Sequence, residues 1–238
     1  MDLRVASYNI RKAVGRDRRR DPDRIIDVLA EVDADVIALQ EADRRFGSRA
    51  SVLSRDALAH AGWHPVPLAE RPQSLGWHGN ALLVRGGAEI VDLARVDLPT
   101  LEPRGAVRAD IAIGGRRVRI AGMHLDLSGF KRRDQLRRVL AHMGECEGHC
   151  PTILMGDFNE WLPRRGALRA FGSPDTFGDW QVLAPGKSYP AGRPLGTLDR
   201  IVVSDHWQVR GTGVHASDRA RWGSDHLPVY AELHLPKT

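Results

Sequence analysis

Several polar side chains that bind metals or transfer protons lie where apolar segments of this 238-residue sequence begin or end. Glu41 follows Val-Ile-Ala-Leu-Gln, and Asp157 follows Ile-Leu-Met-Gly. The residues with this placement are Asn9, Glu41, His124, Asp157, Asn159, Asp199, Asp225 and His226. Turn and cap chemistry is the better explanation for any single aspartate. It does not explain the whole set, because such groups rarely interrupt apolar strands unless they are paired or bound to a ligand.

The chemistry of this set favours a divalent cation that binds oxygen. Carboxylates are the ligands that Mg²⁺ and Mn²⁺ prefer, and no cysteine accompanies them. Glu41 and Asp225 are the best candidates for metal ligands. We therefore expect Mg²⁺ or Mn²⁺ as the cofactor.

Two pairs within the set have spacing or chemistry that fits acid–base work. Asp157 and Asn159 are two positions apart, and in an extended backbone this spacing points both side chains to one side. One could orient a water molecule while the other donates hydrogen bonds to a phosphoryl oxygen. Asp199 and His226 could form a carboxylate–imidazole pair, in which the carboxylate fixes the tautomer and raises the basicity of the ring.

The elements that must position these residues are mostly strands. Alternating or short apolar segments predict strands over 3–8, 35–40, 64–69, 80–84, 89–96, 106–113, 117–125, 151–155, 197–204, 208–214 and 227–235. The Gly114-Gly115 pair predicts a tight hairpin between two of them. Helices are expected over 21–33, where Asp21-Pro22 is a typical helix start, and over 52–61, 130–146 and 164–171.

This order of elements predicts an α/β (α+β) fold. Two mainly antiparallel sheets packed face to face, with single helices on their outer faces, would bury the apolar pattern. The sequence shows no repeat, linker or low-complexity block, so residues 1–238 are expected to form a single domain.

Cysteine usage and the N-terminus bear on the compartment. The only cysteines are Cys146 and Cys150, which favours a reducing environment over a disulfide-stapled secreted fold. The first residues have no apolar signal segment, and the longest apolar stretches are too short to cross a bilayer. We expect a cytoplasmic protein.

The charge balance is compatible with an anionic substrate. The net charge is +5 and the sequence pI about 9.7, which suits nucleic acid or a phospholipid surface. Arginine supplies 31 of the 35 basic residues, so an arginine-rich proteome is an equal explanation.

Seven segments, in order along the chain, resemble the motifs of the endonuclease/exonuclease/phosphatase superfamily. They are Ser7-Tyr8-Asn9-Ile10-Arg11, Leu39-Gln40-Glu41, Gly79-Asn80-Ala81-Leu82-Leu83, Met123-His124-Leu125, Gly156-Asp157-Phe158-Asn159, Leu198-Asp199-Arg200-Ile201 and Ser224-Asp225-His226-Leu227-Pro228-Val229. The resemblance implies a four-layer αββα sandwich with the active site at one end of the sheets. It is closest to deoxyribonuclease-like members and to a small bacterial branch of metal-dependent hydrolases.

The resemblance also implies roles for individual residues. Glu41, Asp225 and Asn9 would hold the metal, and Asn9, Arg11 and Asn80 would contact the substrate. His124, Asp157, Asn159, Asp199 and His226 would be catalytic, with either Asp157 or His226 as the general base. The expected reaction is in-line attack of water on phosphorus.

The substrate and the partners stay open at this stage. DNA, a phospholipid and an inositol phosphate all fit the implied core, and a catalytically inactive binding module on the same fold is the alternative from another class. No protein partner is implied, and a monomer is expected.

Overall fold

The structure is a computed structural model that describes residues 1–100, 104–145, 150–162, 166–173 and 178–237. Two six-stranded sheets form its centre. The first has the order β11 (Gln208–Val214), β12 (Val229–His234), β1 (Asp2–Asn9), β2 (Val36–Gln40), β4 (Ala81–Arg85) and β3 (Trp63–Pro65). The second has the order β5 (Glu89–Val96), β6 (Gly105–Ile113), β7 (Arg116–His124), β8 (Thr152–Asp157), β10 (Asp199–Ser204) and β9 (Trp180–Leu183).

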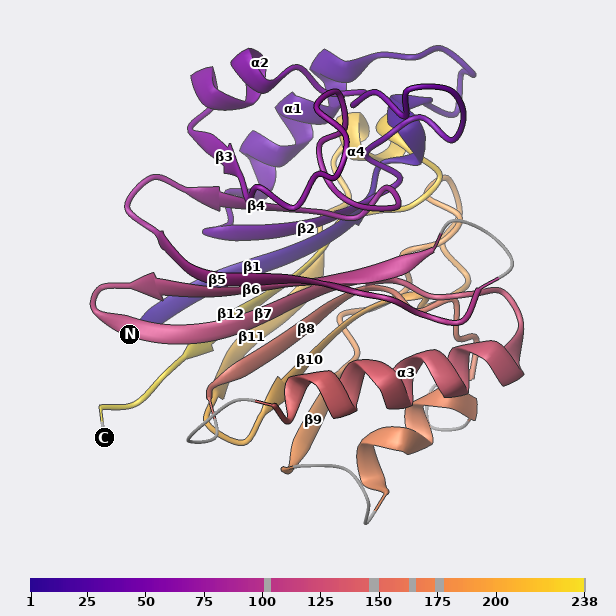
Figure 1. The fold of residues 1–238 in the computed structure, drawn as a ribbon. Helices are drawn as coiled ribbons and strands as arrows, with labels where there is room; N and C mark the ends of the chain where they lie inside the picture. Colours follow the sequence, from indigo (N-terminus) through magenta and orange to yellow (C-terminus); the bar gives the residue numbers. More distant parts are fainter. Residues whose placement is uncertain (101–103, 146–149, 163–165, 174–177, 238) are drawn as a thin grey trace.

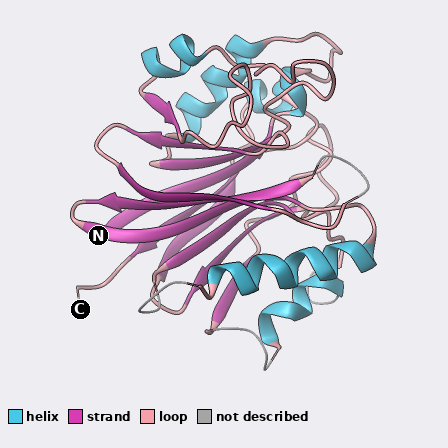
Figure 2. Ribbon diagram, in the orientation of Figure 1, coloured by secondary structure: helices cyan, strands magenta, loops and turns pink. Residues whose placement is uncertain are grey.

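Helices cover the outer face of each sheet, as Figures 1 and 2 show. The first sheet carries α1 (Pro22–Val32), α2 (Arg55–His60) and α4 (Asp218–Gly223), with the 3₁₀ turn η1 (Arg11–Ala13) beside them. The second carries α3 (Gly129–Met143) and the 3₁₀ helix η2 (Gly166–Gly172). The expected αββα sandwich is confirmed, and most strand pairs in both sheets are antiparallel.

The alternation of the strand sequences decides which core each side chain enters. In β1, Leu3 and Val5 lie in the core between the sheets, whereas Ala6 and Tyr8 lie in the core under α1. This is the two-residue period of an extended chain. A third core joins α3 and η2 to the second sheet. Both faces of the central strands are therefore buried, which is why they are apolar almost throughout.

Local capping explains why α1 begins and ends as predicted. The Asp21 side chain accepts a hydrogen bond from the Arg24 backbone N–H, and Pro22 occupies the first helical turn. The helix ends at Val32, and the next residue, Asp33, caps it in the left-handed conformation. The hairpin at Gly114-Gly115 is also confirmed, with both glycines at positive φ.

Other predicted boundaries were wrong. The helix expected over 52–61 begins at Arg55, because Ser54 caps it by accepting from the Ala57 N–H. The strand expected over 64–69 ends at Pro65, since Pro65 and Pro67 lack the N–H that a ladder needs. α3 ends at Met143, before the expected residue 146.

Two short elements, β9 and α4, were not predicted, and one covalent feature differs from expectation. Both elements are six residues or fewer and lie among turn-forming residues. Cys150 is disulfide-bonded, which the expected reducing environment did not anticipate, and residues 146–149 lie outside the described part. Within the described ranges, every helix falls short of the length and apolarity that a bilayer crossing needs.

Strand direction gathers the strand ends that carry polar side chains. β1 and β2 are parallel, and so are β7 and β8, so that the carboxyl ends of each pair lie together. In the register of the second sheet, His124 and Asp199 are both paired with Asp157. One end of the sandwich therefore receives polar groups from both sheets.

Candidate active site

The polar groups at this end of the sandwich form one buried cluster with a more exposed rim. Six of the residues singled out from the sequence are buried there: Asn9, His124, Asp157, Asn159, Asp199 and His226. Glu41 and Asp225 keep 26% and 30% of their side chains exposed. The cluster is thus closed toward the core and open toward solvent at the two carboxylates.

Asp157 lies at the centre of the cluster. Its Oδ2 accepts a hydrogen bond from Asn9 Nδ2 at 3.1 Å and lies 3.3 Å from His124 Nε2. The second oxygen, Oδ1, accepts from the backbone N–H of Asn159 at 2.9 Å. His226 Nε2 lies 3.8 Å from Oδ2. Both sheets thus converge on one carboxylate.

The strand before Asp157 is held close to its neighbour. A Cβ at Gly156 would lie 2.0 Å from the backbone oxygen of Met123, a distance that no side chain tolerates. Only glycine allows β8 to approach β7 this closely. Strand packing therefore explains the glycine that precedes Asp157, independently of the chemistry of the site.

The surrounding cations keep Asp157 ionised. Burial alone would raise the pKa of its carboxyl, but the charge of His226 and the hydrogen bond from His124 outweigh burial, and the pKa lies well below its usual range. A buried carboxylate that stays charged can bind a cation or orient a water molecule.

Asp199 and His226 form the carboxylate–imidazole pair expected from the sequence. His226 Nδ1 lies 2.8 Å from Asp199 Oδ2, which also accepts from the Ser188 hydroxyl at 2.6 Å. Burial would lower the pKa of His226, but the charges of Asp199 and Asp157 raise it to about 10. The other oxygen of Asp199, Oδ1, is buried without a hydrogen-bond partner among the described residues. The Tyr189 ring packs 4.8 Å from the His226 ring.

The three residues predicted to bind metal, Asn9, Glu41 and Asp225, lie on neighbouring segments at this end of the first sheet. Asn9 and Glu41 end adjacent parallel strands, and the Ser224 hydroxyl contacts both the Asn9 carbonyl at 2.7 Å and Asp225 Oδ1 at 3.4 Å. Glu41 adopts a positive φ of 54°, a strained geometry that turns it out of the strand.

The charges beside these three residues fit a divalent cation. Glu41 contacts Lys12 Nζ, and Asp225 Oδ2 lies 3.3 Å from Arg11 Nε. Burial would raise the pKa of Glu41, but the Lys12 contact lowers it below its usual value. The two carboxylates, each beside a cationic side chain, and the Asn9 amide oxygen, which accepts from the Arg11 backbone N–H, make a donor set suited to Mg²⁺ or Mn²⁺. Asp157, Asp199 and His226 form a second group with ligand atoms close enough for one ion.

The remaining predicted residues occupy different positions. Asn159 donates through Nδ2 to the Leu125 carbonyl at 3.0 Å, which ties it to the end of β7. Asn80 is fully buried beside Trp77, with its side-chain oxygen Oδ1 unpaired within the described chain. Asn80 therefore lies behind the site wall, whereas Arg11 is at the rim.

Sequence reasoning missed three residues that the structure places against the cluster. Lys12 contacts Glu41, Ser188 contacts Asp199, and Arg104 contacts both His124 Nε2 and the Leu125 carbonyl. Lys12 and Ser188 adjoin recognisable motifs, so proximity in sequence could have flagged them. Arg104 depends on the pairing of β6 with β7 and gives no sequence signal.

Comparisons with known proteins identify the family and the fold. The sequence matches the Endonuclease/Exonuclease/phosphatase family over residues 6–226, so the chain belongs to that family. No curated protein matches the sequence. The structure is similar to the human Nocturnin catalytic domain with bound sulfate, with a TM-score of 0.75, 20% identity, and coverage of 99% of this chain and 95% of that chain.

Two further solved structures share the fold over nearly their whole length. TDP2 from D. rerio in complex with a single-strand DNA product has a TM-score of 0.72 and 17% identity, with 98% of this chain and 99% of that chain covered. The mannosyl-6-phosphatase Bt3783 from Bacteroides thetaiotaomicron has a TM-score of 0.73 and 22% identity, with the same coverage. At these identities the similarity shows the fold alone.

Proposed function

We propose that this chain is a Mg²⁺- or Mn²⁺-dependent hydrolase of phosphate esters, acting on phosphodiesters and with DNA as a candidate substrate. The observation that carries the proposal is the ionised, buried Asp157 with Asn9, His124 and His226 around it, next to the carboxylates of Glu41 and Asp225. Carboxylates alone would repel a phosphate, so the arrangement needs the cation and the imidazoles to bind one.

Asp157 is the residue that we propose orients the attacking water. It is a pure acceptor, and its neighbours hold both oxygens in place. His226 would donate from Nε2 to the phosphoryl group, since Asp199 already holds Nδ1. Asn9, Asn159 and His124 would donate to the other phosphoryl oxygens. These roles rest on hydrogen-bond direction and on the position of each group around one point.

Glu41, Asp225 and Asn9 would hold the metal ion. When bound, it would offset the negative charge that gathers on the phosphoryl oxygens. Lys12 and Arg11 contact the two carboxylates and would keep them oriented toward the site. Asp199 would act through His226, by fixing its ring.

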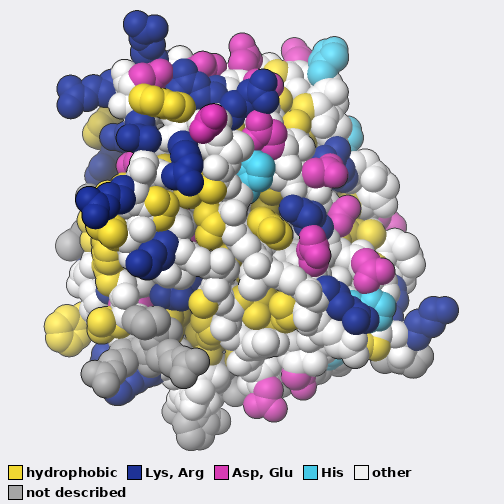
Figure 3. All heavy atoms as spheres, turned by 180° about the vertical axis from the view of Figure 1, so that it is seen from behind, with side chains coloured by type: hydrophobic (Ala, Val, Ile, Leu, Met, Phe, Trp, Pro, Cys, Tyr) yellow, Lys and Arg dark blue, Asp and Glu magenta, His cyan; other side chains and the backbone are white. Residues whose placement is uncertain are grey.

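A phospholipid or an inositol phosphate is the second candidate substrate class. One relative of similar fold is named for a sugar phosphate and another is seen with a DNA product, so the fold does not choose between substrates. The basic side chains gathered in the upper part of the face in Figure 3 suit any of these anions. Monomeric, single-domain behaviour in the cytoplasm remains a prediction from the sequence.

The test is a hydrolysis screen on the purified chain. Plasmid DNA, an abasic duplex, bis(p-nitrophenyl) phosphate, phospholipid vesicles and inositol phosphates would each be incubated with Mg²⁺, Mn²⁺ or chelator. We expect turnover of at least one phosphodiester that chelator abolishes and that Asp157→Asn lowers by about 10²-fold or more. Unchanged turnover in chelator would refute the metal requirement, and no turnover of any substrate would favour the inactive binding module.

A further inference from the structure

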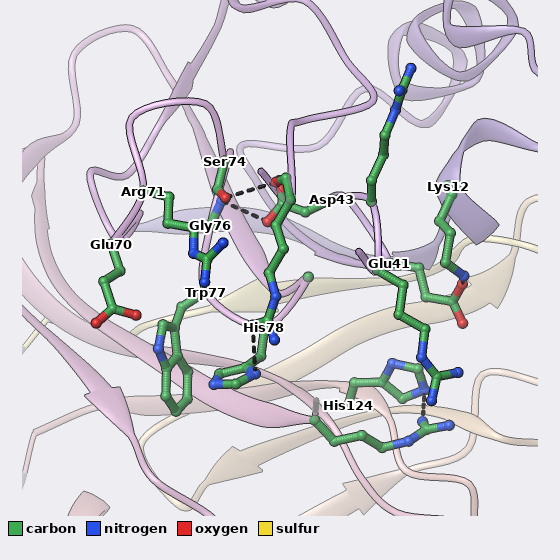
Figure 4. A pocket seen from close by; sticks show the side chains of 15 residues that line it. Lys12, Glu41, Asp43, Glu70, Arg71, Ser74, Gly76, Trp77, His78 and His124 are labelled. Atoms are coloured by element: carbon green, nitrogen blue, oxygen red, sulfur yellow. Dashed lines mark hydrogen bonds and ion pairs between the residues drawn. The ribbon is translucent and has the colours of Figure 1, made fainter. Parts of the chain in front are cut away.

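A pocket adjoins the catalytic cluster on the side of the β2–β4 connection. It has an empty volume of about 730 Å³, including its open mouth. Glu41 and His124 line one end of it, and Trp77, His78 and Arg71 line the other, as Figure 4 shows. The pocket is therefore continuous with the reaction site but extends beyond the groups that would hold the scissile phosphate.

Positive charge dominates the lining of this pocket. Its six cationic side chains are Lys12, Arg44, Arg45, Arg49, Arg71 and Arg104, and its three acids are Glu41, Asp43 and Glu70. Asp43 is turned away, since its carboxylate oxygens accept from the backbone N–H groups of Leu75 and Gly76. The Lys, Arg, Asp and Glu side chains of the lining thus carry a net formal charge of +3, six cations less three acids, before any metal ion is bound at Glu41.

His78 does not compensate the positive charge of the neighbouring Arg49. Its Nδ1 lies 3.5 Å from Arg49 Nη1, so the arginine meets an imidazole rather than a carboxylate. Burial and the charge of Arg49 lower the pKa of His78. The Arg49 charge is therefore not cancelled by its neighbour and can act on a ligand.

The wall of the pocket is fixed before any ligand arrives. Asp43 is 5% exposed and holds the 75–76 backbone, and the Ser74 hydroxyl donates to the Arg49 carbonyl at 2.8 Å. A Cβ at Gly76 would lie 1.9 Å from the Asn80 carbonyl oxygen, so this turn is closely packed. The backbone that carries these cationic side chains therefore needs no rearrangement to admit an anion, although Arg44 and Arg71 themselves are exposed.

We propose that this pocket binds a second phosphate group of the substrate, next to the phosphate that is hydrolysed. The arginine guanidinium groups match the oxygens of a phosphate geometrically and stay charged at all relevant pH values. The substrate class would then be phosphate esters with a flanking phosphate, either along a polynucleotide or on a nucleoside bisphosphate. This inference deepens the proposed function and rests on it for the position of the scissile phosphate.

Binding in chelator tests the pocket without turnover. Calorimetry would compare adenosine 3′,5′-bisphosphate with adenosine 5′-monophosphate, and a thymidine dinucleotide with and without its 5′-phosphate. We expect the added phosphate to improve affinity by about tenfold, the scale of one strong charge-assisted contact. A gain in affinity in both pairs would mean that the pocket accepts a phosphate from a nucleoside bisphosphate and from a polynucleotide. A gain in only one pair would assign the pocket to that class of ligand.

Substitutions of two arginines test whether the gain in affinity comes from the pocket. Arg44→Gln with Arg71→Gln should reduce the gain to less than about threefold, whereas the Lys replacements at the same positions should keep most of it. The matched control is Arg137→Gln with Arg138→Gln, two exposed arginines of α3 on the far sheet. Thermal melting would check that each variant is folded, and Arg44→Gln alone would serve if the double variant is not.

The outcomes separate this inference from the proposed function. Equal affinity for the paired ligands, or an equal loss in the α3 control, would overturn the pocket. A gain that depends on the pocket in a chain that hydrolyses no phosphate ester would support the pocket and reject the hydrolase. Hydrolysis without any gain would reject the pocket alone.

Discussion

Replacement of Asp199 by asparagine removes one charge from a buried pair and leaves its shape. Asp199 is fully buried, and its Oδ2 lies 2.8 Å from His226 Nδ1. The amide oxygen of asparagine can still accept from Nδ1, so the ring should keep its orientation. What changes is the charge that favours the imidazolium form.

The structure gives the scale of the effect. The pKa of His226 is raised from an ordinary 6.5 to about 10, although burial opposes the shift. A difference of about 3.5 units corresponds to about 5 kcal/mol of preference for the charged ring. Asp199 is the largest of the stabilising charges, followed by Asp157. Without it, burial is opposed by fewer charges, so the pKa of His226 should fall toward its ordinary value and most of the rings should be neutral at pH 8.

The assay is the pH profile of kcat/KM on the best phosphodiester substrate. If His226 donates to the phosphoryl group, activity is lost as pH rises through its pKa. The limb should lie near pH 10 in the wild type and about three units lower in Asp199→Asn, with a loss of about 10–10²-fold at pH 8 that shrinks toward pH 6. A double-mutant cycle with His226→Ala should be strongly non-additive. Additive losses with an unshifted limb would show that Asp199 is only a structural cap.

Three other testable outcomes follow from the contacts of Glu41, Gly156 and Glu31. Glu41→Gln should weaken Mg²⁺ or Mn²⁺ binding by about tenfold or more in a calorimetric titration, and full activity in excess chelator would contradict the metal site. Gly156→Ala should destabilise the fold by about 2 kcal/mol or more in denaturant unfolding, because its Cβ would strike the Met123 carbonyl, whereas the control Gly172→Ala has open space around its Cβ. The third outcome concerns Glu31 of α1. Burial would raise the pKa of its carboxyl, but hydrogen bonds from Ser217, His215 and Arg219 lower this pKa to about 2. Its stabilisation, about 1–2 kcal/mol after solvent screening, is then complete above about pH 4.5 and fades as pH falls toward 2, and a constant stability difference between wild type and Glu31→Gln over that range would be inconsistent with this.

The strand ends were predictable because each carries its own local signal. A short apolar segment followed by Glu41 or Asp157 indicates both the strand and the position at which it ends. α1 was predictable for the same reason, since Asp21 and Pro22 define its start within two residues. The pairing of Asp199 with His226 follows from their chemical complementarity.

Contacts that depend on strand register had no such signal. Arg104 reaches His124 because Gly105 is paired with His124 across β6 and β7, and the sequence does not specify that register. The cationic pocket combines Lys12, residues between 41 and 79, Arg104 and His124, so it arises only from tertiary packing. β9 and α4 are too short for periodicity to distinguish them from turns.

The pairing of β1 with β12 has a kinetic consequence. Leu3 is paired with Leu233. This pairing joins the strands that come first and last in the sequence, so the contact spans almost the whole chain. Closing so long a loop is entropically expensive and slows folding relative to locally connected folds. Asn9 and Asp225 are carried by these two ends and meet only when the loop closes. The proposed site can therefore assemble only after residues 225–234 have been synthesised and β12 has paired with β1.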